Sequence, residues 1–479
     1  AVMLIPVLMK WHRPLMLFSW NVPVMLFFIR GDPSLFLVMI VLSLTAMIVE
    51  RALVHKRFIH VPQITWPLVI LIGVVVITAK FTGGIGLRAF GSDVYGGKKY
   101  VFLVVAILGY FAIGSLPIPA AKARKYVVLY FAGGVFCFIQ DLLPVMPHFL
   151  YPLFWLIPPV GYSSLGSGLD PGTARLAGTS ETGAALVSVL AALYGLRGIF
   201  LSGKLWRPVV FCISFLLIFL GGFRSSVIGM TATLLILFFL EKLHRTILLP
   251  ALVIFALVAA AVIVPLAPHL PYTFQRDLTI LPRSLVHVRA DARADAEDSW
   301  QWRVDMWTAL LPEIPKHFWL GKGYALSPED FNAELASGAA IKNTADASQQ
   351  GLALASDYHN GPLSVILPFG IWGVIAVGCF FISGLWVTYR NYRYSPPELQ
   401  RLNAFLFATF IWSVIVFFGG SLAVGMSAFT GLLGLSVAIN RGVRRKPAEE
   451  NRNVPFSIPI RSRRLARMPV PPSLQPKRP

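Results

Sequence analysis

The sequence predicts an all-α polytopic membrane protein with about twelve transmembrane helices and one large helical loop outside the membrane. Hydrophobic residues make up 56% of the 479 residues and charged residues only 13%, whereas a soluble domain carries roughly 25% charged residues. The mean hydropathy is +0.68. Apolar runs long enough to cross a bilayer as helices recur along the chain, and helices satisfy their backbone hydrogen bonds internally in lipid.

Twelve apolar segments are expected to be the transmembrane helices. In chain order they lie near residues 14–29, 33–50, 63–79, 100–119, 126–140, 183–200, 206–222, 225–240, 246–267, 361–388, 402–418 and 422–440. Nine of them fall in residues 1–267 and three in 361–440, on either side of the polar loop 268–358. The first segment follows Lys10 and Arg13 and lacks a small-residue cleavage site, so we expect a signal anchor and not a removable signal peptide.

The distribution of basic residues predicts the orientation. If both ends of the chain are cytoplasmic, 27 of the 42 Lys and Arg residues fall on the cytoplasmic side, in the short loops there and at the two ends. Cytoplasmic loops are typically rich in Lys and Arg. The loop 268–358 is then periplasmic, and its 8 basic and 12 acidic residues give it a net charge of −4. We therefore expect a multi-pass protein of a bacterial inner membrane with its active site facing the periplasm.

The net charge of +20 does not indicate a nucleic-acid partner, because the basic residues gather at cytoplasmic membrane edges and in the tail. The tail 441–479 is basic and Pro-rich, and it lacks a helical period. We expect it to be disordered and cytoplasmic, and to be attracted to anionic lipid headgroups.

Within the large loop, the stretch from Asp298 predicts an amphipathic helix that ends near Pro312 and Pro315. One face of this helix would carry the apolar residues Trp300, Val304, Trp307, Leu310 and Leu311. Gly321 and Gly323 then predict a tight turn. Small and polar residues over 335–356 predict a mobile flap. The chain contains no GxxxxGKS, HExxH or DxD motif, so no nucleotide, metal or other cofactor is expected.

A histidine stands where the polar loop meets the tenth apolar segment. Asp357, Tyr358, His359 and Asn360 come directly before the run that starts at residue 361. His359 would then lie at the water boundary, where it either caps the helix or takes a proton from a substrate hydroxyl.

Three arginines are expected at the same depth as the histidine. Arg175 precedes the sixth segment, Arg224 lies between the seventh and eighth, and Arg303 lies on the loop helix. In the simpler alternative, each of these arginines only extends its side chain to the membrane interface and binds no ligand. Several guanidinium groups together, however, bind the oxygens of a pyrophosphate without a metal. A pyrophosphate-linked lipid with a sugar beyond it would match this placement.

These residues resemble the signature of the O-antigen ligase and O-antigen polymerase superfamily. The stretches "RVDMWTALL" and "GKGYA", and then "HNGPLSVILPFGIWG", resemble the family's Arg-Trp-Ala helix, its Gly-x-Gly turn and its His-to-Gly block. The stretches "RLAG" and "FRSS" around Arg175 and Arg224 resemble two upstream arginine motifs. The resemblance covers residues near 170–440. The chain departs from it after "RLAGT", where the family often has Asn-Pro-Asn and this chain has Ser180, Glu181 and Thr182.

The resemblance implies a GT-C-like glycosyltransferase whose glycan donor is carried on undecaprenyl pyrophosphate. Transfer would invert the anomeric carbon without a metal, and the acceptor would be the lipid A core. His359 would activate the acceptor hydroxyl, while Arg224 and Arg303, assisted by Arg175, would hold the pyrophosphate. The supporting residues would be Asp357, Tyr358, Asn360, Gly321 and Gly323.

Two other functions stay open at this point. A polymerase would use the same chemistry with another lipid-linked glycan as acceptor, and the sequence does not separate it from a ligase. A transporter or flippase would carry ionisable residues near the membrane midplane in repeated halves. Here the segment interiors are nearly free of charge and the halves differ, so transport is disfavoured.

Overall fold

The structure is a computed structural model of the whole chain. It describes residues 5–54, 59–86, 96–115, 117–142, 145–159, 175–325 and 358–441. The predicted tail beyond Arg441, the expected flap and Asp357 lie outside the described residues.

Helices dominate the described residues, where β-structure is limited to one isolated bridge between Met25 and Ser34. The first half of the chain forms α1 (Ile5–Ser19), α2 (Leu35–Val54), α3 (Pro62–Thr82), α4 (Gly97–Gly114), α5 (Ala120–Ala132), η3 (Gly133–Cys137), α6 (Phe138–Leu142), η5 (His148–Leu150), α7 (Leu153–Leu156), α8 (Ala177–Phe200), α9 (Trp206–Leu220) and α10 (Arg224–Leu240). The second half forms η7 (Leu243–Arg245), α11 (Leu248–Leu266), η8 (Ala267–His269), α12 (Tyr272–Leu278), α13 (Ala290–Leu310), α14 (Glu313–Lys316), α17 (Gly361–Tyr394), α18 (Pro397–Phe417) and α19 (Leu422–Asn440).

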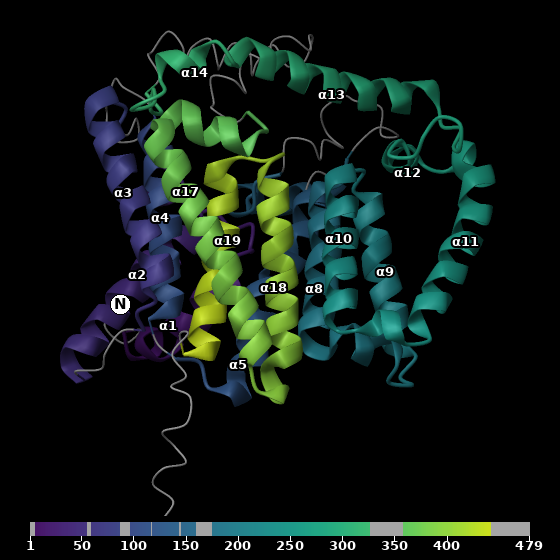
Figure 1. Cartoon of the computed structure of the whole chain (residues 1–479), viewed down its shortest axis with the longest axis horizontal. Helices are drawn as coiled ribbons and strands as arrows, with labels where there is room; N and C mark the ends of the chain where they lie inside the picture. The colour runs from purple at the N-terminus through teal and green to yellow at the C-terminus, as the bar shows by residue number, and fades with distance from the viewer. Residues whose placement is uncertain are drawn as a thin grey trace, which may run out of the picture. The chain divides into compact units, whose positions relative to one another are not determined.

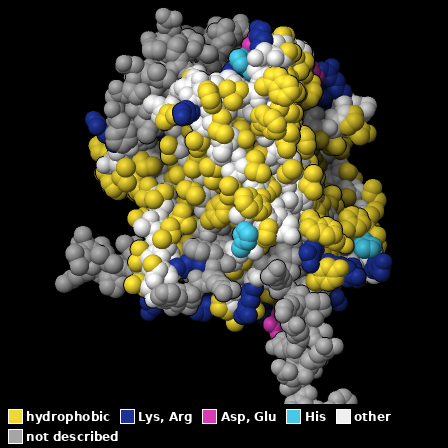
Figure 2. Space-filling view, turned by 60° about the vertical axis from the view of Figure 1, so that its left-hand side comes forward, with side chains coloured by type: hydrophobic (Ala, Val, Ile, Leu, Met, Phe, Trp, Pro, Cys, Tyr) yellow, Lys and Arg dark blue, Asp and Glu magenta, His cyan; other side chains and the backbone are white. Residues whose placement is uncertain are grey.

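The predicted membrane class is confirmed in its coarse form. Eight described helices are long and apolar enough to cross a membrane, and three shorter apolar helices, among them α9 and α10, lie with them. The predicted number of twelve spans stays a prediction. In Figure 2, apolar side chains cover the middle of the face shown, whereas lysine and arginine side chains gather toward its upper and lower edges. This distribution is typical of a protein that sits in a bilayer.

The first apolar segment was predicted at the wrong place. The helix α1 ends at Ser19, and much of the predicted segment 14–29 forms a turn and an extended stretch instead. Pro23 explains the difference, because proline lacks the amide hydrogen that a helix needs and pushes the residue before it, Val22, toward an extended conformation.

Two long helices contain breaks that hydropathy does not predict. The helix α8 is interrupted at Gly195, where φ is 62°, and α17 is interrupted at Gly370, where φ is 60°. Only glycine adopts this backbone conformation at little cost. In Figure 1 the short first part of α17 turns away from its long second part. The predicted span 361–388 is therefore two helical pieces.

The loop helix α13 begins at Ala290, earlier than predicted, and its packed face matches the predicted one only in part. Trp300 and Leu311, predicted on the apolar face, are 58% and 54% exposed. The packed side chains are Trp307 and Leu310 of the predicted face together with Trp302 and Met306, in a cluster around Tyr358. The spacing of 302, 306 and 310 also defines one helical face, so the pattern allowed two solutions. Tertiary packing against Tyr358 selects between them.

The packed bundle consists mainly of α4 against α19, α8 against α9, and α17 against α3 and α18. Small residues allow this close approach, which is typical of membrane helices. A side chain at Gly434 of α19, for example, would meet Ile113 of α4. By contrast, α11 has no buried residue, and its main neighbours are η7 and η8 at its own ends. Figure 1 shows α11 standing apart from α9 and α10.

The helices α12, α13 and α14 extend across the end of the bundle at which α8, α10 and α17 begin (Figure 1). Arg175, Arg224 and His359 all lie at or just before the starts of those three bundle helices. The topology therefore brings the predicted polar residues to one end of the bundle.

Candidate active site

Two arginines from separate parts of the chain pair with one carboxylate of α13, and a third lies near them. Arg175, just before α8, places Nη2 3.3 Å from Oδ1 of Asp295. Arg276 of α12 places Nε 3.0 Å from Oδ2 of the same residue. Tyr272 donates its hydroxyl hydrogen to Oδ2 at 3.4 Å. Arg224, the first residue of α10, lies close enough to Arg276 and Asp295 for their charges to act on one another.

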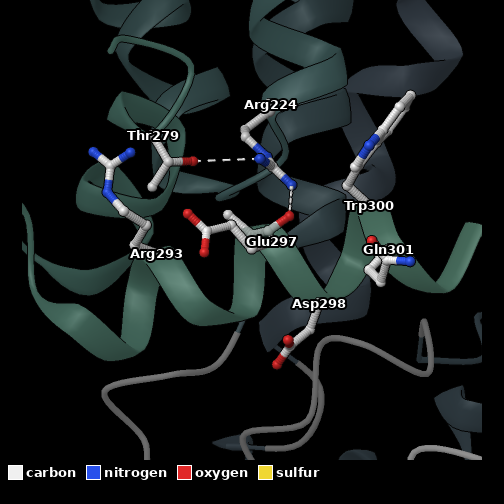
Figure 3. Close-up of a pocket in the computed structure, with 8 residues that line it drawn as sticks. Arg224, Thr279, Arg293, Glu297, Asp298, Trp300 and Gln301 are labelled. Atoms are coloured by element: carbon white, nitrogen blue, oxygen red, sulfur yellow. Dashed lines mark hydrogen bonds between the residues drawn. The ribbon is translucent and has the colours of Figure 1, made fainter. Parts of the chain in front are cut away.

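Arg224 is fixed by two hydrogen bonds from its guanidinium group. Nη1 donates to Oγ1 of Thr279 at 3.3 Å, and Nη2 donates to the carbonyl oxygen of Ala296 at 3.2 Å. Figure 3 shows both bonds, with the guanidinium pointing from α10 toward α13. The turn that precedes α10 depends on Gly222, which adopts a φ of 68°. This turn positions Arg224 at the end of the bundle.

The arginine cluster (Arg175, Arg224 and Arg276) holds more positive charge than Asp295 alone neutralises. Arg276 is only 4% exposed, and among the described residues its Nη1 meets no hydrogen-bond partner. Burial, assisted by the positive charge of Arg175, lowers the pKa of Arg276 to about 10. A buried donor without a partner is costly, so the cluster favours an anion that would accept its hydrogen bonds.

Asp277 adds a second buried acid beside the arginine cluster. It is 2% exposed, and neither of its carboxylate oxygens accepts a hydrogen bond from a described residue. Burial raises the pKa of Asp277 to about 7, against the opposing charges of Arg276 and Arg224. The cost of burying a charged carboxylate outweighs the attraction of the arginines. Asp277 is therefore partly protonated near neutral pH and neutralises the cluster only in part.

His359 lies two residues before Gly361, the first residue of the broken helix α17. Its φ is 45°, a left-handed conformation that is rare for a non-glycine residue. Asn360 caps the helix, since its side chain accepts a hydrogen bond from the amide of Leu363 at 3.1 Å. Tyr358 is fully buried, and Nε1 of Trp307 donates to its carbonyl oxygen at 2.8 Å. These bonds fix the backbone on both sides of His359, which supports the left-handed conformation.

Trp302 of α13 contacts both predicted polar residues of this half of the site. Its ring centroid lies 5.7 Å from that of His359, and the Cζ atom of Arg303 lies 5.8 Å from the Trp302 ring. Nη1 of Arg303 also donates to the carbonyl oxygen and to Oγ of Ser299, at 2.9 and 3.1 Å. The structure therefore places Arg303 with His359 and not with the arginine cluster.

The predicted turn at Gly321 and Gly323 packs against the break in α17 and hydrogen-bonds to the backbone there. The amides of Lys322 and Gly323 donate to the carbonyl oxygens of Leu367 and Pro368, at 2.7 and 3.0 Å. These oxygens belong to the turn of α17 that breaks at Gly370. Side chains at Gly321 and Gly370 would collide with the opposite backbone, at Pro368 and Trp319. This backbone pairing, which we call the glycine clasp, holds the short helical piece that follows His359.

The helix α13 connects the two halves of the site. Asp295 and Trp302 are seven residues apart, which corresponds to about 10 Å along a helix axis. A cavity of about 520 Å³ opens beside Arg224, and its lining consists of Arg224, Thr279, Arg293, Ala296, Glu297, Asp298, Trp300 and Gln301. In Figure 3, Arg224 and the Trp300 indole lie on the same side of α13, while Asp298 points away. The cavity combines an aromatic surface with charged and amide groups.

The fold and this site define a multi-pass helical membrane protein with a cluster of arginines and a histidine at one end of its bundle. Residues 208–378 match the family model described as O-Antigen ligase. The match confirms the resemblance to the O-antigen ligase superfamily and supports an enzyme of the ligase or polymerase type. No curated protein matches the chain.

The matched segment contains Arg224, Arg276, Arg303 and His359, but it begins at residue 208 and so does not include Arg175. Arg276 and Asp295 were missed by sequence reasoning, although they complete the arginine cluster. A signal for Arg276 was present, because Arg276 and Asp277 are adjacent charges soon after the predicted apolar segment 246–267. Asp295 lies in an acidic stretch that reads as an ordinary solvated helix face.

Proposed function

We propose that this protein is an O-antigen ligase-like glycosyltransferase that acts on the periplasmic side of a bacterial inner membrane. It moves a glycan from undecaprenyl pyrophosphate to a hydroxyl group of the lipid A core, without a metal and with inversion. The observation that carries the proposal is the arginine cluster, with its unused donor on Arg276, at the end of a membrane bundle. The family match supports the same chemistry.

In this proposal the arginine cluster binds the pyrophosphate of the donor. The acceptor hydroxyl oxygen attacks the anomeric carbon from the face opposite the pyrophosphate. The bond between that carbon and the pyrophosphate oxygen breaks, and its electron pair leaves with the oxygen. Guanidinium groups that already surround the pyrophosphate stabilise the negative charge that develops on it.

His359 takes the proton of the acceptor hydroxyl as the new bond forms. General base catalysis needs a proton acceptor within hydrogen-bond reach of the attacking oxygen. The separation of about 10 Å along α13 leaves room for the glycosyl unit between the pyrophosphate and the base. Trp302 positions His359, and Arg303 serves this half of the site through Trp302. This assignment differs from the sequence-based prediction that Arg303 holds the pyrophosphate.

The sugar next to the pyrophosphate would occupy the cavity beside Arg224. Trp300 offers an exposed aromatic face, and Gln301 and Glu297 offer hydrogen-bonding groups for hydroxyls. An apolar ring face together with a few oriented polar groups is a typical composition for a small-molecule site.

Transfer from purified lipid-linked donor to lipid A core in liposomes tests the proposal directly. Product should form with the wild-type protein and fall sharply with a His359 variant. The surface glycan of a deletion strain separates the acceptors. Polymer that is made but not attached indicates a ligase, and a single repeat unit left on the core indicates a polymerase. Unchanged surface glycan would contradict both, and transport of the lipid-linked glycan without transfer would indicate a flippase.

A further inference from the structure

A second cavity lies at the far ends of the helices that carry the candidate active site. The helices α5, α8 and α18 pack on one another. The last residue of α18, Phe417, lies against Gly361 at the start of α17, so Pro397 at the start of α18 lies at the other end. There a cavity of about 800 Å³ opens between the three helices. We call it the basal cavity, lined by Ala120, Ala121, Arg124, Lys125, Val128, Ala192, Leu193, Tyr194, Gly195, Pro397, Glu398, Leu399, Arg401 and Leu402.

The rim of the basal cavity is positively charged. It carries Arg124, Lys125 and Arg401 against one acid, Glu398. Among the described residues, Arg124 and Lys125 meet no hydrogen-bond or ion-pair partner. The helices α5 and α18 also begin here, at Ala120 and Pro397, and helix N-termini carry partial positive charge.

A further acid, Glu241, neutralises this rim only in part. Glu241, whose charge acts on Arg401, accepts hydrogen bonds from the amides of Leu196 and Arg197, at 3.2 and 2.9 Å. Its carboxylate thereby caps the helical piece that follows the break at Gly195. The basal cavity therefore retains an excess of positive charge, which favours an anionic occupant.

The arrangement of charged and apolar residues in the basal cavity indicates what kind of anion fits. Its inner wall consists of apolar side chains that belong to candidate membrane spans, namely Val128, Ala192, Leu193 and Leu402. Its charged rim lies where α5 and α18 begin. A phospholipid has the same order of parts, since a charged headgroup lies at the membrane edge and apolar chains extend inward. Basic pockets between the ends of transmembrane helices are known to bind anionic headgroups.

We propose that the basal cavity binds an anionic phospholipid, with its phosphate on Arg124, Lys125 and Arg401. The chain's own tail does not fit, because residues 441–479 hold 11 basic residues against 2 acidic ones. A nucleotide is disfavoured as well, because Arg207 already stacks on the Tyr194 ring, with Cζ 3.9 Å from its centroid. With the predicted orientation, the lipid would come from the cytoplasmic leaflet. The proposal is independent of the glycosyltransferase function.

The test compares lipid retention by the full chain and its variants in nanodiscs of phosphatidylcholine that contain about 10 mol% cardiolipin. Native mass spectrometry measures the retained lipid. The variant Arg124→Gln/Lys125→Gln/Arg401→Gln removes the rim charges. The control Lys122→Gln/Lys204→Gln/Arg245→Gln removes three charges outside the cavity lining. We expect the wild type and the control to retain cardiolipin, and we expect the rim variant to retain less by a factor of about ten or more.

Three results would overturn the proposal. One is wild-type protein that shows no preference for cardiolipin over phosphatidylcholine. Another is equal retention by the rim variant and the control. A third is thermal stabilisation by millimolar inorganic phosphate equal to that by cardiolipin, which would assign the basal cavity to a soluble phosphate compound. If the rim variant does not fold, the single substitutions Arg124→Gln and Lys125→Gln should each lower cardiolipin retention by severalfold.

Discussion

At the scale of single residues, Asp277 and Arg276 are neighbours in the chain, and both are buried beside the candidate phosphate site. Burial raises the pKa of Asp277 to about 7 in the folded protein, whereas an unfolded aspartate titrates near about 3.9. The folded state therefore binds this proton more tightly. The stabilising contribution is complete below about pH 4 and is lost as the pH rises through about 7.

We expect Asp277→Asn to remove this pH dependence of stability. Between the two pKa values, wild-type stability should fall by up to about 1.4 kcal/mol for each pH unit through this group alone. The asparagine variant should melt at nearly the same temperature at pH 5 and pH 8, while the wild type melts lower at pH 8. If the melting temperatures of the two proteins change equally with pH across this range, Asp277 does not titrate there.

Arg224 and Arg276 are predicted to hold the pyrophosphate of the donor. Arg224→Ala and Arg276→Ala should each cost about 1.5–3 kcal/mol, or roughly 10- to 150-fold in affinity for undecaprenyl pyrophosphate. Arg289→Ala is the matched control, because Arg289 belongs to the same loop but pairs with Asp291 at the surface. Equal binding by all three folded variants would reduce the arginine cluster to a structural role.

His359 is predicted to be the general base, and its backbone conformation guides the choice of variant. Asparagine tolerates the left-handed φ that His359 adopts and keeps a polar group, but it cannot take the proton. We expect His359→Asn to fold and bind the carrier normally, and to turn over about 10²–10⁴-fold more slowly. The measurement is glycan transfer in liposomes, with melting and carrier binding recorded in parallel. Near-normal turnover would leave His359 as a residue that merely precedes the cap.

The sequence indicated individual residues of the site better than it indicated their partners. Arg175 and Arg224 stand out because isolated charges beside apolar segments need a reason to be there. Asp295 does not stand out, because its role comes from the fold of α12 over α13. Arg303 was grouped with the arginines by its predicted depth and by the family resemblance. Position along α13 separates it from them, and only the structure provides that position.

At the scale of elements, the glycine clasp makes α17 depend on a single backbone conformation. Gly370→Ala should lower stability by about 1–3 kcal/mol, because alanine is strained at this φ and its Cβ collides with Trp319. Gly378→Ala in the same helix is the control, since nothing lies within 4 Å of the added Cβ. Thermal melting in detergent measures both. Similar melting temperatures for the two variants would show that the break is not required.

Hydropathy predicted the apolar helices within a few residues in most cases but not their continuity. A run such as 361–388 records how many apolar residues follow one another. It does not record that Pro368 and Gly370 interrupt the hydrogen bonds, or that a distant turn at Gly321 and Gly323 supplies replacements. The breaks in α8 and α17 come from contacts between segments far apart in sequence. A single-sequence pattern therefore contains no direct signal for them.

At the scale of the whole molecule, the candidate active site is predicted to face the periplasm. The prediction rests on the distribution of basic residues and is checked with a membrane-impermeant maleimide on intact cells. In a chain whose three native cysteines are replaced by alanine, Leu311→Cys should be labelled without permeabilisation. Lys204→Cys, at the other end of the bundle, should be labelled only after it. The reverse pattern would contradict the proposed function as well as the orientation.

The helix α11 brings a different consequence. It is strongly apolar and long enough to cross a membrane, yet none of its residues is buried by protein. Lipid then supplies nearly all of its packing, and lipid adapts to any apolar surface. Substitutions among leucine, valine, alanine and phenylalanine in α11 should thus be nearly neutral, while the same exchanges in α4 or α19 should not. In a population of variants, the sequence of α11 should therefore vary freely as long as its residues stay apolar.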